Sequence, residues 1–329
     1  MAMQTKIGYG NKTDIDTAIT ATTIDEGDII FTKDTNEIAF VKPDKSVMYP
    51  KDRTSKDYTL NGTSLGALQN GEKIPEGTSI DELLNMITQK AIAPTYTQPT
   101  VTLAKSGSGT AAGNYEAGTS ITPIFTATYN KNDAGDLTKL AVLKGSSEVG
   151  SDTSSPYTYT GEAIVLGDET ITFKAQATYE DGPVKNNNLG QPDATGQIKA
   201  GTKDSSAISF QGQRNLFWGT GAGELPALNS ETIRGLTNKK LNPTQGYSFT
   251  INVSVGQQNV LICYPSSLRD ISKVHYVEGN DPNLAQNFSK TNVNVADARG
   301  GESGIKEYKC YTLHLSTPAQ ATMTLNVTI

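Results

Sequence analysis

Apolar and polar side chains alternate with a period of two along several stretches of this chain. The clearest run lies between Glu169 and Tyr179, and its apolar positions are Ile171, Phe173, Ala175, Ala177 and Tyr179. This period buries one face of a strand and leaves the other in water, as in antiparallel sheets. Turn clusters such as Lys131–Gly135 separate the runs. The pattern therefore predicts an immunoglobulin-like β-sandwich at residues 94–207.

The C-terminal part of the chain shows the same pattern. Residues 247–255 and 321–329 alternate, whereas Asn259–Tyr264 is a continuous apolar run. A continuous run is typical of a strand that is covered on both faces. We predict a second antiparallel β-sandwich at residues 208–329, and a mainly β fold class for the chain.

Near the N-terminus the pattern predicts a hairpin. Two β-rich runs, residues 28–33 and 37–41, flank a turn at Asp34-Thr35-Asn36. Because one hairpin is marginal alone in water, we expect residues 1–57 to attach to a partner surface. The side chains expected to make this attachment are Ile29, Phe31, Ile38 and Phe40. A flexible N-terminal arm is the alternative.

The pattern of residues 58–93 predicts a connector that contains one short helix. Ser79 and Glu82 form a capping box at its start, and the helix is expected to end before Pro94. The apolar stripe of the helix follows a helical spacing and consists of Ile80, Leu83, Leu84 and Ile87. This stripe either packs against other copies of the chain around a symmetry axis or docks on a neighbouring domain of the same chain.

Composition supports a β-rich, modular protein and excludes some partners. Thr, Ser, Asn and Gly are abundant, whereas long helices would need more Ala, Leu, Glu and Lys. The formal net charge is −6 and no basic run is present, which argues against a nucleic-acid partner. There is no signal-peptide pattern and no apolar run as long as a membrane span, so we expect synthesis in a cytoplasm and no membrane partner.

Few residues are suited to catalysis. The two histidines, His275 and His314, lie in strand-like runs, and no nucleophile-and-base pattern accompanies them. Cys263 and Cys310 are too far apart in sequence for a zinc site and are interpreted as reduced, buried residues that can be neighbours across a sheet. We therefore predict no catalytic residues, no metal site and no cofactor. Trp218 is either a platform for a sugar or receptor or, alternatively, an anchor of the core.

Three stretches resemble a known family. Glu26–Phe40 is similar to the N-terminal segments of fibre proteins from phages that infect Bacteroidales, including the crAss-like phages. Ala177–Val184 is similar to modules of those proteins, and so is the region from Arg214–Thr220 through Ile262–Asp270. The resemblance implies a virion protein that attaches by its N-terminus and carries no catalytic residues.

The resemblance also implies a symmetric oligomer on the particle surface. A homotrimer is the first expectation and a dimer the second. The short chain favours a head fibre or capsid decoration over a tail fibre or receptor-binding protein. Capsid or other virion proteins are the expected partners at the N-terminus, and a host-surface glycan is the expected contact at the outer sandwiches. The alternatives are a small phage polysaccharide depolymerase and a bacterial surface adhesin.

Overall fold

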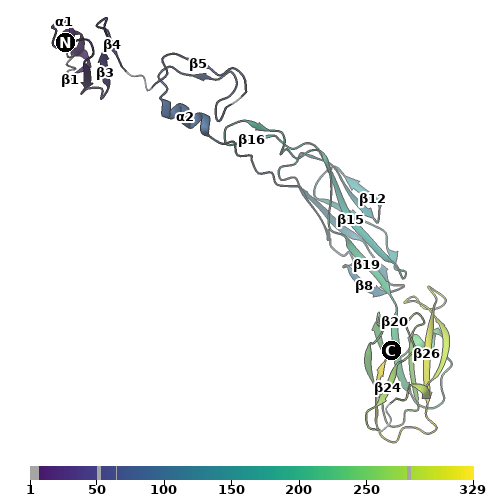
Figure 1. The fold of residues 1–329 in the computed structure, drawn as a ribbon. Coiled ribbons are helices and arrows are strands. Elements are labelled where there is room, and N and C mark those ends of the chain that lie inside the picture. Colours follow the sequence, from purple (N-terminus) through teal and green to yellow (C-terminus); the bar gives the residue numbers. More distant parts are fainter. Residues whose placement is uncertain (1–6, 50–52, 64, 280–282) are drawn as a thin grey trace. The chain divides into compact units, whose positions relative to one another are not determined.

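The computed structural model describes residues 7–49, 53–63, 65–279 and 283–329. The chain forms two compact units. One comprises residues 1–94 and 185–196, and the other comprises residues 95–184 and 197–329. Most regular elements are strands in antiparallel sheets, which confirms the predicted mainly β fold class (Figure 1).

The predicted hairpin is part of a four-stranded sheet with the order β1-β2-β3-β4. The elements of this N-terminal domain are β1 (Ile7–Gly10), η1 (Lys12–Asp14), α1 (Ile15–Thr20), β2 (Ile29–Thr32), β3 (Ile38–Val41) and β4 (Val47–Met48). Helix α1 covers one face of the sheet, and together they bury Ile15, Ile19, Ile24, Ile30, Ala39 and Val41. The hairpin predicted from the sequence is therefore not isolated, because β1, β4 and α1 complete a small core around it.

The connector forms the predicted helix α2 (Ile80–Thr88) beside a short pair of strands, β5 (Tyr58–Thr59) and β6 (Lys73–Ile74). The capping box is confirmed, because the Ser79 hydroxyl accepts a hydrogen bond from the Glu82 backbone N–H and the Glu82 carboxylate accepts one from the Ser79 N–H.

A second small hairpin, β16 (Lys185–Asn186) with β17 (Pro192–Asp193), belongs to the same unit as the connector. The Asn188 side chain in its turn accepts from the Ile92 N–H at 2.6 Å and donates to the Lys90 carbonyl at 3.1 Å. This hairpin lies within the range predicted for the first sandwich, so residues 185–196 are an excursion from that domain.

The first sandwich packs a three-stranded sheet, β13-β10-β7, against a larger sheet of order β12-β11-β15-β19-β8, in which β18 also pairs with β15. Its strands are β7 (Thr100–Lys105), β8 (Gly113–Glu116), β9 (Ser120–Ile121), β10 (Ile124–Asn130), β11 (Leu137–Lys144), β12 (Ser147–Asp152), β13 (Tyr157–Thr160), β14 (Ile164–Val165), β15 (Thr170–Tyr179), β18 (Gly201–Asp204) and β19 (Ile208–Gln213). The predicted alternating strand is β15, and its Phe173 ring meets the Phe125 ring of the opposite sheet at 5.1 Å.

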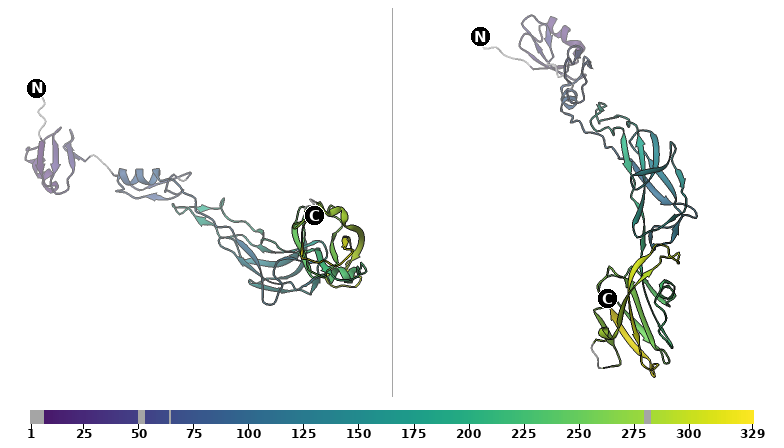
Figure 2. Two further views of the ribbon diagram at one scale, coloured as in Figure 1. Left: turned by 90° about the horizontal axis from the view of Figure 1, so that it is seen from below. Right: turned by 90° about the vertical axis from the view of Figure 1, so that its right-hand side faces the viewer.

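The C-terminal sandwich packs the sheet β21-β20-β23-β26-β25 against the sheet β22-β27-β24 (Figures 1 and 2). Its elements are β20 (Asn215–Gly221), α3 (Ser230–Arg234), β21 (Asn238–Leu241), β22 (Ser248–Val253), β23 (Asn259–Pro265), β24 (Lys273–Tyr276), η2 (Ala285–Asn287), β25 (Ser289–Val295), β26 (Lys306–His314) and β27 (Met323–Thr328). The continuous apolar run is β23, in which every residue is buried. Its even-numbered side chains Val260, Ile262 and Tyr264 face the core between the sheets, and Cys263 on the opposite face belongs to a second cluster that includes Ile233 of α3.

The boundary between the two sandwiches lies later than predicted. Strand β19 pairs with β15 and β8 of the first sandwich, and β20 begins two residues after it ends. Arg214 is therefore the single residue between the sheets, and the first sandwich extends to Gln213 instead of ending at residue 207. Periodicity could not show this, because both strands carry inward-facing side chains.

Candidate functional site

The sheet of the N-terminal domain exposes large apolar side chains on the face opposite α1. The exposed fractions are 72% for Ile7, 77% for Tyr9, 40% for Phe31, 43% for Ile38 and 46% for Met48. Ile29 and Phe40 are half-buried between them. We call these seven residues the outer apolar face.

Strand register shows that the seven residues share one side of the sheet. One row runs across all four strands through Ile7, Ile29, Phe40 and Met48. The next row runs through Tyr9, Phe31 and Ile38. Side chains that are directly opposite on neighbouring strands point to the same face. The rows are therefore adjacent and form one continuous apolar surface.

All four attachment residues predicted from the sequence, Ile29, Phe31, Ile38 and Phe40, lie on this face. Sequence reasoning missed the three contributed by the flanking strands. Ile7 and Tyr9 alternate with Gly8 and Gly10, and this short alternation is the signal that could have identified them.

The position of the hairpin turn is set by polar contacts around Lys12. The Lys12 ammonium lies 2.6 Å from a Glu37 carboxylate oxygen and 4.1 Å from the centre of the Tyr49 ring. The Lys12 backbone N–H also donates to Asp34 at 2.8 Å. The hydrogen bond with Glu37 raises the pKa of Lys12, and the same bond lowers the pKa of Glu37. These contacts tie the β2–β3 turn to the start of the helical segment.

Asn36 completes that turn with φ 54°, a left-handed conformation that Asn adopts more readily than most residues. The Asp/Asn turn signal in the sequence is therefore confirmed.

The predicted apolar stripe of helix α2 is exposed to solvent at two positions and partly covered at the other two. Ile80 and Leu84 are 51% and 48% exposed, whereas Leu83 and Ile87 are half-buried. The Ala67 N–H donates to the Met86 carbonyl, so the chain around Gly66 packs directly on the end of the helix. Half of the stripe is thus covered by the connector itself, and the other half faces solvent with Tyr58 and Leu65.

Trp218 lies in β20 and is half-buried. Its ring packs on Phe249 of the opposite sheet with ring centres 4.7 Å apart. The structure thus shows Trp218 in contact with the core, which was the alternative that the sequence analysis gave for this residue. A receptor or glycan contact through Trp218 stays a prediction.

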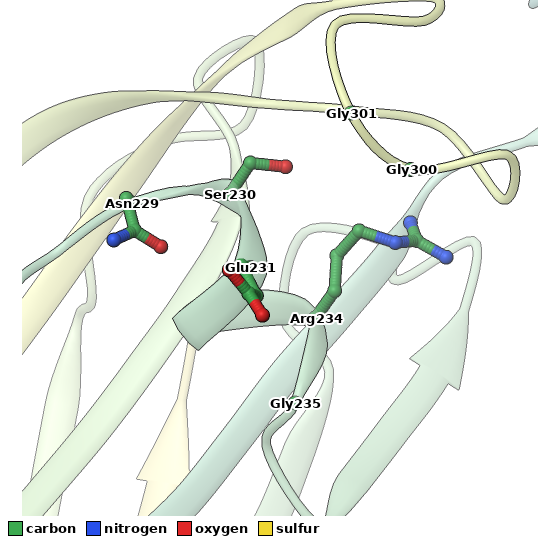
Figure 3. A pocket seen from close by; sticks show the side chains of 7 residues that line it. All are labelled: Asn229, Ser230, Glu231, Arg234, Gly235, Gly300 and Gly301. Atoms are coloured by element: carbon green, nitrogen blue, oxygen red, sulfur yellow. The ribbon is translucent and has the colours of Figure 1, made fainter.

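A pocket with a volume of about 670 Å³ lies between α3 and the loop that carries Gly300 and Gly301 (Figure 3). Three of its polar side chains already have structural partners. Asn229 accepts from the Thr232 N–H, and the Ser230 hydroxyl accepts from the Ala296 N–H, both at 2.9 Å. Arg234 donates to the Ala296 carbonyl at 3.0 Å. The pocket therefore offers few free groups that converge on a ligand.

The two histidines lie on different sheets, His275 in β24 and His314 in β26. His314 Nδ1 lies 2.6 Å from the Asn259 side-chain oxygen. The Asn259 amide in turn donates to the carbonyls of Gly223 and Glu224, so this cluster anchors a loop. Within residues 7–49, 53–63, 65–279 and 283–329, no group of three or more His, Cys, Asp and Glu side chains is arranged to hold a metal ion. In the same residues, no helix has the length and apolar character needed to cross a membrane.

No family model matches this chain, and no curated protein matches it. A solved structure of fibronectin(III)-like modules of CbhA from Clostridium thermocellum is similar at 15% identity, over 66% of this chain and 94% of that chain, with a TM-score of 0.23. That score is too low to support an argument, so the β-sandwich architecture described here rests on the strand pairing and the two cores.

Proposed function

We propose that this chain is a structural, non-catalytic protein of a bacteriophage particle, a fibre or decoration that the N-terminal domain attaches to the virion. The observation that carries the proposal is the outer apolar face. The N-terminal domain already buries a core on the α1 side of its sheet, so the exposed side is not needed to complete that core. Continuous apolar surfaces of this kind mark protein–protein contacts.

The partner is an apolar surface of the capsid or of another virion protein. Burial of one large apolar side chain contributes about 1.5–3 kcal/mol, and the outer apolar face offers several in adjacent rows. A head fibre is the version that we favour over a tail fibre. The sandwiches are then the outward modules, and weak contacts of each copy with a host-surface glycan would be strengthened by multivalency.

The attachment is tested with the variant Phe31→Ser/Ile38→Ser, introduced into the phage that encodes the chain. We expect the copy number per purified particle, counted by electron microscopy and quantitative mass spectrometry, to fall roughly tenfold or more. Val255→Ser is the matched control, because Val255 is a 64% exposed apolar residue outside the N-terminal domain. An unchanged copy number, with the domain folded by circular dichroism, would refute the attachment.

We further propose that the exposed half of the α2 stripe joins copies of the chain into a trimer, with a dimer as the second expectation. Ile80 and Leu84 supply this contact. The variant Ile80→Ser/Leu84→Ser should shift the mass in solution toward the monomer, as measured by analytical ultracentrifugation. Asn85→Ser, an exposed polar change on the same helix, should not. A full-length protein that is monomeric at all accessible concentrations would eliminate this oligomer.

A further inference from the structure

Two free cysteines lie opposite each other on neighbouring strands of one sheet of the C-terminal sandwich. Cys263 in β23 and Cys310 in β26 are directly opposite in the antiparallel register. Both are fully buried and both are thiols. They therefore lie on two adjacent inner strands of the five-stranded sheet.

The register is compatible with a disulfide bond. Opposed residues of an antiparallel pair have Cα atoms about 4.5–5.5 Å apart, inside the range of about 4.4–6.8 Å that disulfides span. The two side chains also point to the same face of the sheet, because directly opposed residues of neighbouring strands do so. Closure thus needs rotation of the side chains and little movement of the backbone.

The surroundings explain why the pair can remain reduced. Phe217, Ile233 and Tyr308 enclose the two sulfur atoms in a buried cluster. The neighbouring Cys310 side chain and the burial both raise the pKa of Cys263. The thiolate is the reactive form, so the folded sandwich slows oxidation. The cover on this side includes α3, a helix of five residues.

We propose that Cys263 and Cys310 are a latent disulfide site that exchanges with a low-molecular-weight disulfide when the α3 cover opens. One cysteine thiolate attacks the small disulfide, forms a mixed disulfide and releases one small thiol. The second cysteine then attacks the protein sulfur of the mixed disulfide and releases the other small thiol. The two protein hydrogens pass to the released thiols, so the protein dithiol is oxidised and the small disulfide is reduced. This inference does not depend on the proposed function.

The bond would cross-link the sheet and close the segment 264–309, which contains β24 and β25. A cross-link over a loop of this length restricts the denatured chain. We expect it to raise the Tm of the transition in which the C-terminal sandwich unfolds by about 10 °C.

The test uses the full chain, fully reduced and then incubated with oxidised glutathione. We expect the intact mass to fall by about 2 Da, a Cys263–Cys310 cross-linked peptide in a non-reducing digest, and the higher Tm. Cys310→Ser should gain one glutathione at most and no increase in Tm. The inference is overturned if the wild-type protein keeps both thiols while its denatured form is oxidised, if it yields only glutathione adducts, or if the bond lowers the Tm.

The role of the cover is tested by comparing two core variants of the same sandwich. Ile233→Ala loosens α3 over the cysteines, whereas Val274→Ala weakens the core on the other side of the sheet. We expect Ile233→Ala to oxidise at least several-fold faster than Val274→Ala when both are compared at equal stability. Equal rates would show that the small disulfide reaches the cysteines only when the whole sandwich unfolds. That result would overturn the proposed role of α3 as a cover.

Discussion

Asp297 is a buried carboxylate with an ion-pair partner, Arg299, and its side chain is only 3% exposed. It accepts hydrogen bonds from the Arg299 backbone N–H at 3.0 Å and from Arg299 Nη2 at 2.7 Å. The Arg299 side chain is the main cause that lowers the pKa of Asp297. The loop after β25 therefore depends on a charge that must stay ionised.

Asp297→Asn should destabilise the C-terminal sandwich by about 1–3 kcal/mol at pH 7, because charge-assisted hydrogen bonds are lost at a buried position. A lowered pKa in the folded state stabilises the protein above the ordinary pKa of about 3.9. That contribution disappears as the pH falls through the lower, folded-state pKa. The difference in Tm between wild type and variant should therefore be constant from about pH 5 to 7 and shrink below about pH 4.

Thermal unfolding at a series of pH values checks this expectation. The control is Asp136→Asn, which removes a carboxylate from an exposed pair with Lys131 and should leave the Tm nearly unchanged. A Tm difference for Asp297→Asn that persists undiminished at pH 2 would contradict the conclusion that ionised Asp297 stabilises the sandwich.

At the scale of elements, the close approach of β19 to the loop before β15 depends on Gly212. A Cβ atom on Gly212 would lie 1.7 Å from the carbonyl oxygen of Gly167. No side chain fits there without displacing backbone, so the last strand of the first sandwich could not keep its present position.

Gly212→Ala should therefore lower the stability of the first sandwich by about 1–3 kcal/mol, the usual cost of overpacking. Gly221→Ala is the matched control, because Gly221 is also a strand glycine and a Cβ there has no neighbour within 4 Å. Urea unfolding, monitored by tyrosine fluorescence, compares the stability of the two variants. Amide hydrogen exchange in β19 shows whether this strand is the part that is destabilised. Equal stability of both variants would show that β19 can shift at no cost.

At the scale of the whole molecule, the two sandwiches of the larger unit share polar contacts across their junction. The Glu116 carboxylate lies 2.6 Å from Arg234 and 3.6 Å from Lys239, with Glu116 15% and Arg234 20% exposed. Arg214, between β19 and β20, pairs with Asp168 at 2.6 Å. The Ala298 N–H also donates to the Ala117 carbonyl at 2.8 Å. These contacts couple the two domains.

Glu116→Ala should cost about 1–3 kcal/mol, because it leaves the largely buried Arg234 without its carboxylate. The expected readout in calorimetry is one transition for both sandwiches in the wild type and two separate transitions in the variant. Glu148→Ala removes a carboxylate from an exposed pair with Lys139 and should preserve the single transition. Two independent transitions in the wild type would contradict the coupling.

The elements that the sequence determined by itself are those with a local signal. The alternation in Glu169–Tyr179, the capping box at Ser79 and the turn at Asp34–Asn36 depend only on residues a few positions apart, and the structure contains all three. The same local pattern predicted Phe31 and Ile38 as attachment residues, and the structure exposes both.

Only the tertiary structure decided which segments pair. The Gly-rich strand β1 has a weak pattern of its own, yet its parallel pairing with β2 adds Ile7 and Tyr9 to the outer apolar face. Likewise, β19 and β20 are separated by one residue and lie in different sandwiches, and Cys263 meets Cys310 only through the β23–β26 register. Pairing between distant segments depends on non-local packing and loop closure, which the period of side chains along one strand does not encode.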